Sequence, residues 1–165
     1  KDYAVCFGVE PEIWQKAEDN QYVPETSLTE TEIRMPGGHL TIAQLIALLN
    51  TIPMEITFVD VDNINRFFNE GPKDFKRPGM AIDREVFSCH PPKIEATVRR
   101  IIGEFRAGAL DEVPIWMDKN GKCMLVRYMA VRDKEGKYLG TLELVQDMGF
   151  AKEHFQPEKR QEEIW

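Results

Sequence analysis

The chain has 165 residues, and 28 acidic against 21 basic side chains give it a formal net charge of −7. Its 42% hydrophobic and 30% charged residues exclude a disordered or fibrous protein, and the length fits one domain with an arm. The acidic excess argues against nucleic-acid and anionic-membrane partners, and no apolar run approaches the ~20 residues that span a bilayer.

The start of the chain and its cysteines predict the kind of protein it comes from. It opens on Lys1 rather than Met, so we expect a piece of a longer protein. The three cysteines, Cys6, Cys89 and Cys123, lie far apart without a CxxC pair. This pattern argues against a disulfide framework and predicts a cytoplasmic location.

Residues 1–38 are interpreted as an N-terminal arm or linker, because they combine scattered aromatic residues with many turn formers. A short helix is predicted over Pro11–Ala17, since proline suits the first helical position. Glu32–Met35 is a candidate short strand.

A lead-in helix is predicted over residues 41–51. Thr41 and Gln44 form a T-x-x-Q capping box, and Pro53 stops the helix. Apolar residues recur with helical spacing at Ile42, Leu45, Ile46 and Leu49. We expect this face to pack against the domain, or to pair with a second copy of the chain.

Two strands and a second helix follow. Residues 54–60 and 64–68 are rich in β-branched and aromatic residues around an Asp62-Asn63 turn, which predicts a hairpin. Glycine and proline break residues 69–88 into short turns. The next helix is predicted to be capped by His90, to begin at Pro91-Pro92 and to end at Gly108. Its expected buried stripe is Ile94, Val98, Ile101, Ile102 and Phe105.

Three further strands complete the pattern, at residues 112–118, 123–132 and 138–146. Asn120-Gly121 is a strong signal for a type I′ hairpin between the first two. The element order predicts an α+β fold, a five-stranded antiparallel sheet with helices on one face. Residues 150–165 are expected to form a polar C-terminal tail.

This order and several motifs resemble the PAS domain. MEITFVDVDNINRFFNEG is similar to the first PAS hairpin, SCHPPKIEATVRRIIGEF to the long connecting helix, and YMAVRDKEGKYLGTLELVQDM to the final hairpin with its R-D-x-x-G-x-x-x-G pattern. The usual closing Asp-Ile-Thr is here Asp147-Met148-Gly149, so only the aspartate is kept.

A narrower resemblance concerns a subgroup of this family. The segments ITFVD, RFFNEG and CHPP, with the lead-in GGHLTIAQLIALLNTIP, resemble PAS modules of bacterial and archaeal proteins that also carry a hemerythrin-type (HHE) cation-binding domain. The resemblance covers residues 40–149. It implies a PAS-like domain over 39–149 that senses a small ligand or redox state between sheet and helices. Such a domain signals through homodimerisation or a neighbouring domain of the parent protein.

The candidate ligand-binding residues come from the predicted pocket walls: Phe58, Phe67, Cys89, His90, Ile94, Val98, Arg127 and Met129. Cys89 and His90 are weak candidates for haem or metal, since thiolate and imidazole suit such ions. The structural interpretation, in which His90 caps the helix and Cys89 packs as a small apolar residue, is favoured. Arg66, Arg127 and Arg132 are candidates for pairing with an anionic ligand, and the alternatives for such a strand arginine are solvent or a bridge to Glu143.

Three alternatives to a ligand sensor remain open. One is a ligand-free PAS module that serves dimerisation alone, and another is a haem or metal sensor that uses Cys89 and His90. The third is a small enzyme with Cys89 as nucleophile, but GxSxG, GxGxxG and P-loop motifs are missing, so we expect no enzyme. The histidines, at 39, 90 and 154, are too scattered to predict a metal site.

Overall fold

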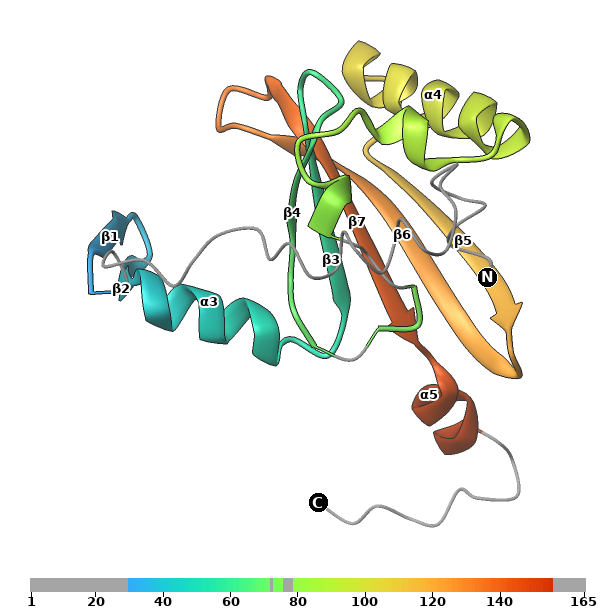
Figure 1. Ribbon diagram of the computed structural model, residues 1–165, viewed down its shortest axis with the longest axis horizontal. Coiled ribbons are helices and arrows are strands. Elements are labelled where there is room, and N and C mark those ends of the chain that lie inside the picture. Colours follow the sequence, from blue (N-terminus) through green and yellow to red (C-terminus); the bar gives the residue numbers. More distant parts are fainter. Residues whose placement is uncertain (1–29, 72, 76–78, 156–165) are drawn as a thin grey trace.

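The computed structural model of the protein describes residues 30–71, 73–75 and 79–155 (Figure 1). The expected helix over 11–17, most of the arm and the end of the tail lie outside these residues. The elements in chain order are β1 (Glu32–Met35), β2 (Gly38–Thr41), α3 (Ile42–Thr51), β3 (Glu55–Asp60), β4 (Asn65–Phe68), the 3₁₀ turns η1 (Gly79–Ala81) and η2 (Val86–Cys89), α4 (Pro92–Ala107), β5 (Glu112–Lys119), β6 (Lys122–Arg132), β7 (Tyr138–Asp147) and α5 (Gly149–His154).

The main sheet confirms the predicted α+β fold. Its five strands follow the order β4-β3-β7-β6-β5, and every neighbouring pair is antiparallel. The Asn120-Gly121 turn has φ angles of 52° and 80°, as a type I′ hairpin requires. Asn63, in the turn between β3 and β4, also adopts a positive φ of 65°.

The N-terminal part forms a hairpin and a helix. The predicted strand β1 pairs with β2, a strand that the sequence did not reveal, so the hairpin crosses the expected boundary at residue 39. Both hydrogen bonds of the capping box are present at Thr41 and Gln44. The helix α3 then projects away from the sheet (Figure 1), and Ile46 and Leu48 are about half exposed.

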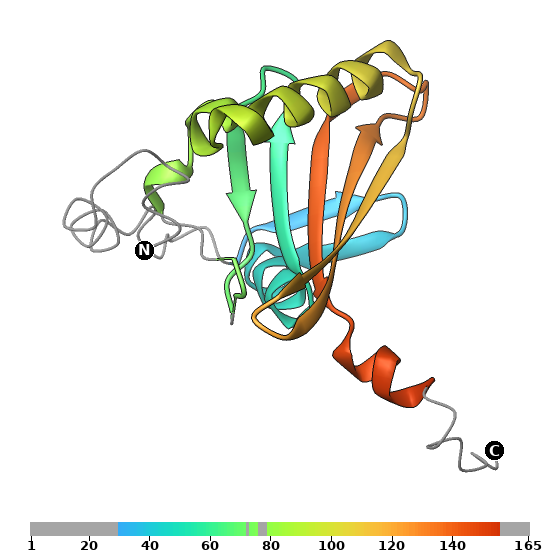
Figure 2. The ribbon, with the colours of Figure 1, turned by 90° about the vertical axis from the view of Figure 1, so that its right-hand side faces the viewer.

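The long helix α4 lies across the sheet, at the end opposite α3 (Figures 1 and 2). Gly108 ends it in the left-handed conformation, φ 75°, as predicted. Two expectations about its beginning were wrong. The N-cap is Pro91 rather than His90, and Ile94 is 48% exposed because it lies on the first turn, before the part of the helix that enters the core clusters.

The core fills the space between α4 and the sheet. Phe105 is fully buried, and Ile101 packs with it against Tyr138 of β7. The hydroxyl groups of Tyr138 and Thr141 lie 2.7 Å apart, so this core contains a satisfied polar pair. Among the described residues, no helix has the length and hydropathy needed to cross a bilayer.

Candidate functional site

A cavity lies between the sheet and α4. The residues that line it come from strands, from η2 and from α4: Val59, Val86, His90, Val98, Ile101, Ile102, Tyr128, Thr141 and Glu143. The strand register explains why the strand residues meet there. Val59 is paired with Thr141, and Tyr128 with Glu143, so all four face the same side of the sheet.

The cavity is small, with a volume of about 10 Å³. That is close to the smallest space that holds one water molecule, whereas pockets for drug-sized ligands usually measure roughly 300–1,000 Å³. In this conformation the apolar side chains of α4 and η2 therefore close the site. A larger ligand requires α4 or η2 to move away from the sheet.

His90 is the cavity residue whose chemistry is most clearly defined. Its Nδ1 lies 2.8 Å from the carbonyl oxygen of Val86, which can only accept a hydrogen bond. Nδ1 therefore carries a proton, and in the neutral ring Nε2 keeps its lone pair. The η2 turn thus fixes both the tautomer and the orientation of the ring, which suits His90 for contacting a ligand.

Most of the polar side chains of the cavity come from the sheet, and most of the aliphatic ones come from η2 and α4. Thr141 is 3% exposed, and Tyr128 and Glu143 are partly buried on the neighbouring strand positions. Hydroxyl, carboxylate and imidazole groups against valine and isoleucine provide directional bonds beside a wide apolar contact. This division is typical of small-molecule sites.

The predicted site residues divide between several places. His90 and Val98 line the cavity, whereas Ile94 does not line it and is about half exposed. Four others lie on the opposite sheet face, one register position away from the lining residues: Phe58, Phe67, Arg127 and Met129. The backbone of Cys89 belongs to η2, but its side chain lies outside the described part of the chain. The ligand role of all eight stays a prediction.

The arginines proposed for anionic ligands have protein partners. Arg127 donates from Nε to Glu112 Oε1 at 2.6 Å, rather than to Glu143. This hydrogen bond raises the pKa of Arg127 and lowers the pKa of Glu112. Arg66 binds Asp60 and Asp83, and Arg132 donates to Asp111 and to the carbonyl oxygen of Phe105 near the end of α4.

Three polar residues of the cavity were missed from the sequence: Tyr128, Thr141 and Glu143. The signal that marks them is Glu143 between Leu142 and Leu144, a carboxylate inside an otherwise apolar strand. Within the described residues, no cluster of three or more His, Cys, Asp or Glu residues is arranged to hold a metal ion.

The antiparallel sheet with a cavity beneath its long helix makes this an α+β domain, and comparison with known proteins identifies the family. The PAS domain family model matches residues 45–149, so the chain belongs to the PAS family. None of the curated proteins searched matches the sequence.

Solved structures include a similar C-terminal domain from Streptococcus mutans, at 37% identity and a TM-score of 0.72 over 76% of this chain and 98% of that one. A PAS domain from Colwellia psychrerythraea is 15% identical, with a TM-score of 0.47 over 64% of this chain and 95% of that one. A sensory box sensor histidine kinase from Vibrio cholerae is 12% identical, with a TM-score of 0.44 over 62% of this chain and 88% of that one.

Proposed function

We propose that the chain is a cytoplasmic, non-enzymatic PAS sensor domain whose ligand binds between the sheet and α4. The observation that carries this proposal is the fixed imidazole of His90 at an otherwise largely aliphatic cavity. A small molecule with an apolar body and a hydrogen-bonding group fits this division. The proposed signal is the displacement of η2 or α4 that a ligand larger than one water molecule requires.

Mass spectrometry of small molecules released from the purified protein tests this proposal. We expect a molecule to be recovered from the wild type and lost from His90→Ala. The matched control is His39→Ala, because His39 lies in the N-terminal hairpin, where it pairs with Glu32. Recovery of the same molecule from His90→Ala, or of none from the wild type, would contradict the proposal.

The second candidate is a ligand-free PAS module, and the small cavity volume favours it. A domain that serves only as a docking or dimerisation surface needs no space for a ligand. The two candidates differ in the response of the cavity residues to small molecules. If a fragment library leaves the NMR signals of Val59, His90 and Thr141 unchanged, the ligand-free module is the better account.

A haem or metal sensor is the third candidate. The Nδ1 of His90 donates to a carbonyl group, an arrangement typical of an imidazole that binds a metal ion through its other nitrogen. A cavity of about 10 Å³ does not fit a haem, however. The visible spectrum of protein purified from an iron- and haem-sufficient host decides this question, and the absence of a Soret band would remove the haem proposal.

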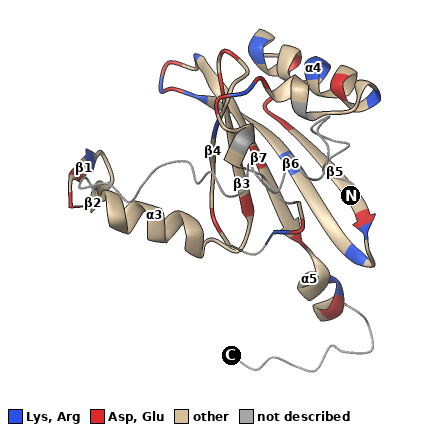
Figure 3. Cartoon of the chain, in the orientation of Figure 1, with Lys and Arg blue, Asp and Glu red and all other residues tan. Residues whose placement is uncertain are grey.

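We also propose that the domain forms a homodimer through α3. This helix contains no charged residue, whereas α4 carries both signs of charge (Figure 3). Ile46 and Leu48 are exposed on it by 47% and 52%. Residues two positions apart lie on different sides of a helix, so a second copy of the same uncharged helix would cover the side that carries the more exposed of the two, Leu48. Light scattering should give a dimer mass for the wild type and a monomer mass for Leu48→Glu; a wild-type monomer at high concentration argues against the dimer.

The parent protein is proposed to join this sensor to a hemerythrin-type cation-binding domain. The support is the likeness of the lead-in and hairpin motifs, GGHLTIAQLIALLNTIP, ITFVD and RFFNEG, to PAS modules of that kind. The sequence of the complete gene tests this part of the proposal directly. A gene that encodes no HHE-type domain, or one that lacks the di-iron ligands, would contradict it.

A further inference from the structure

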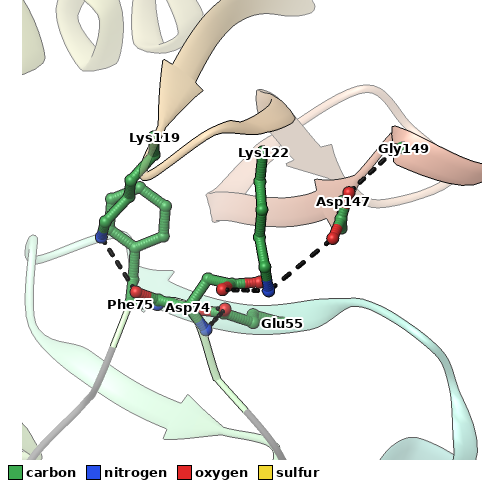
Figure 4. Close-up of polar contacts among 7 residues, drawn as sticks. All are labelled: Glu55, Asp74, Phe75, Lys119, Lys122, Asp147 and Gly149. Carbon is green, nitrogen blue, oxygen red and sulfur yellow. Dashed lines mark hydrogen bonds and ion pairs between the residues drawn. The ribbon is translucent and has the colours of Figure 1, made fainter. Parts of the chain in front are cut away.

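A set of polar contacts joins three segments at the end of the sheet away from α4. We name it the Lys122 network, and Figure 4 shows its members: Glu55, Asp74, Phe75, Lys119, Lys122, Asp147 and Gly149. The segments are residues 73–75 after β4, the β5–β6 hairpin and the junction of β7 with α5, and Glu55 of β3 holds the first of them. The cavity lies elsewhere, so these contacts are separate from the proposed ligand site.

Glu55 fixes the segment 73–75. Glu55 is only 7% exposed. Its carboxylate accepts hydrogen bonds from the backbone N–H groups of Asp74 and Phe75, the latter at 3.1 Å. A buried carboxylate requires such donors. Phe75 also packs against the core cluster that contains Met124 and Val126. The segment is therefore held by the first residue of β3 and by the core.

Two lysines of the β5–β6 hairpin hold the same segment from the other side. Lys119 donates from Nζ to the carbonyl oxygen of Asp74 at 2.9 Å, and its ammonium lies 3.2 Å from the centroid of the Phe75 ring. Lys122 donates to Asp74 Oδ1 at 2.7 Å. The position of residues 73–75 is thus coupled to the position of the hairpin.

Lys122 is shared between two carboxylates. Besides Asp74, its Nζ lies 3.7 Å from Asp147 Oδ2, which is longer than a hydrogen bond. The other oxygen of Asp147 accepts the backbone N–H of Gly149 at 2.8 Å, at the first residue of α5. The hydrogen bond to Asp74, together with the charge of Asp147, raises the pKa of Lys122.

We propose that Lys122 couples the segment 73–75 to the start of α5 by exchanging Asp74 for Asp147. When the segment moves, the ammonium leaves Asp74 and closes on Asp147. Because that carboxylate also accepts Gly149, the new ion pair fixes it and stabilises the first turn of α5. The segment precedes η1 and η2 in the chain, so a signalling role would start from a displacement of η2 at the cavity; that role rests on the proposed function, but the exchange of partners does not.

Hydrogen exchange at the backbone amides of residues 149–155 measures the coupling without a ligand. We expect Asp74→Ala to slow exchange about two- to fivefold, since it releases Lys122 to Asp147, and Lys122→Gln to accelerate it by a similar factor, the range expected for exposed ion pairs. The double variant should behave as Lys122→Gln alone, and Lys122→Arg should restore the wild-type rate. Opposite signs distinguish partner exchange from a merely structural network, in which both substitutions accelerate exchange.

The matched control is Asp118→Ala, which removes an exposed carboxylate from the same hairpin and should leave the exchange rates unchanged. Acceleration or no change in Asp74→Ala would overturn the proposal, as would a double variant that differs from Lys122→Gln. These outcomes concern the apo protein, so they are independent of whether a ligand is ever recovered. A sensor without partner exchange and a partner exchange without a ligand are thereby distinguished.

Discussion

The side-chain amide of Asn69 donates to the carbonyl oxygen of Leu49 at 3.1 Å and so joins the last turn of α3 to the end of β4. The same nitrogen donates to Met54, and Oδ1 accepts the backbone N–H of Ile56 at 2.8 Å. Asn69 is 2% exposed, so one buried side chain connects the lead-in helix, the link to β3 and the strand itself. The last turn of α3 is therefore tied to the sheet through this side chain.

Replacing Asn69 with leucine should destabilise the domain and loosen α3. The variant leaves the N–H of Ile56 and two carbonyl groups without their bonds, and each buried unsatisfied group costs roughly 1–3 kcal/mol. We expect a loss of about 2–4 kcal/mol in the free energy of unfolding, measured with urea. The matched control is Asn50→Leu, which removes the more exposed contacts to Glu70 and should cost less than about 1 kcal/mol. Equal losses in the two variants would refute the special role of Asn69.

Most of the fold could be predicted from local signals in the sequence. The capping box at Thr41, the turn at Asn120-Gly121 and the left-handed glycine at 108 each act within a few residues, and all three are present. The strand β2 was missed because it is only four residues long and contains Gly38. Such a strand is defined by its partner β1 rather than by its own pattern.

The candidate site was less predictable, because it depends on which face of each strand is inward. In β6 apolar residues occupy both faces, so alternation did not show that Val126 and Tyr128, rather than Arg127 and Met129, belong to the inner side. The contact of His90 with Val86 depends on the η2 turn, which has no clear sequence signal. Register and loop geometry are tertiary properties, and they decide the site.

Substitution of Gly140 by alanine should destabilise the sheet strongly. A Cβ at this position would lie 2.3 Å from the carbonyl oxygen of Val59 and 2.8 Å from the Phe58 ring, closer than such atoms approach. Relief requires β3 and β7 to separate, which we expect to cost at least about 2 kcal/mol. In Gly103→Ala, by contrast, the added Cβ meets no atom within 4 Å, and the helix α4 should gain roughly 0.5–1 kcal/mol. Thermal unfolding of both variants measures this contrast, and a stable Gly140→Ala would show that the strands are not in tight contact there.

Stability should fall in acid partly through Asp60. Burial alone would raise its pKa, but hydrogen bonds from Ile64, Arg66 and Asp62 outweigh burial, so the pKa of Asp60 lies below its ordinary value. A lowered pKa in the folded state adds stability above the unfolded pKa of about 3.9, and this contribution is lost as the pH falls through the folded pKa. Urea unfolding between about pH 5 and 3 should therefore show a shallower decline for Asp60→Asn than for the wild type. The control Asp118→Asn should follow the wild type; parallel curves for all three proteins would exclude Asp60 as a source.

Two valines of nearly equal burial allow the cavity to be compared with the rest of the core. Val98 is 5% exposed and lines the cavity, whereas Val126 is 4% exposed and packs in the cluster with Met124 and Val145. Truncation of either residue to alanine removes the same atoms and should cost about 1–3 kcal/mol. The loss should be smaller in Val98→Ala.

The reason is that the enlarged cavity would border His90 and Thr141, and a water molecule with such polar partners can occupy it, while an apolar void stays empty. Urea unfolding gives the difference in free energy, and a water-to-imidazole NOE at His90 reports the water itself. If Val98→Ala loses as much free energy of unfolding as Val126→Ala or more, and shows no NOE, the polar side chains of the cavity do not bind a water molecule there. A hydrated cavity in Val98→Ala would show that they do, which is the property that a sensor needs at this position.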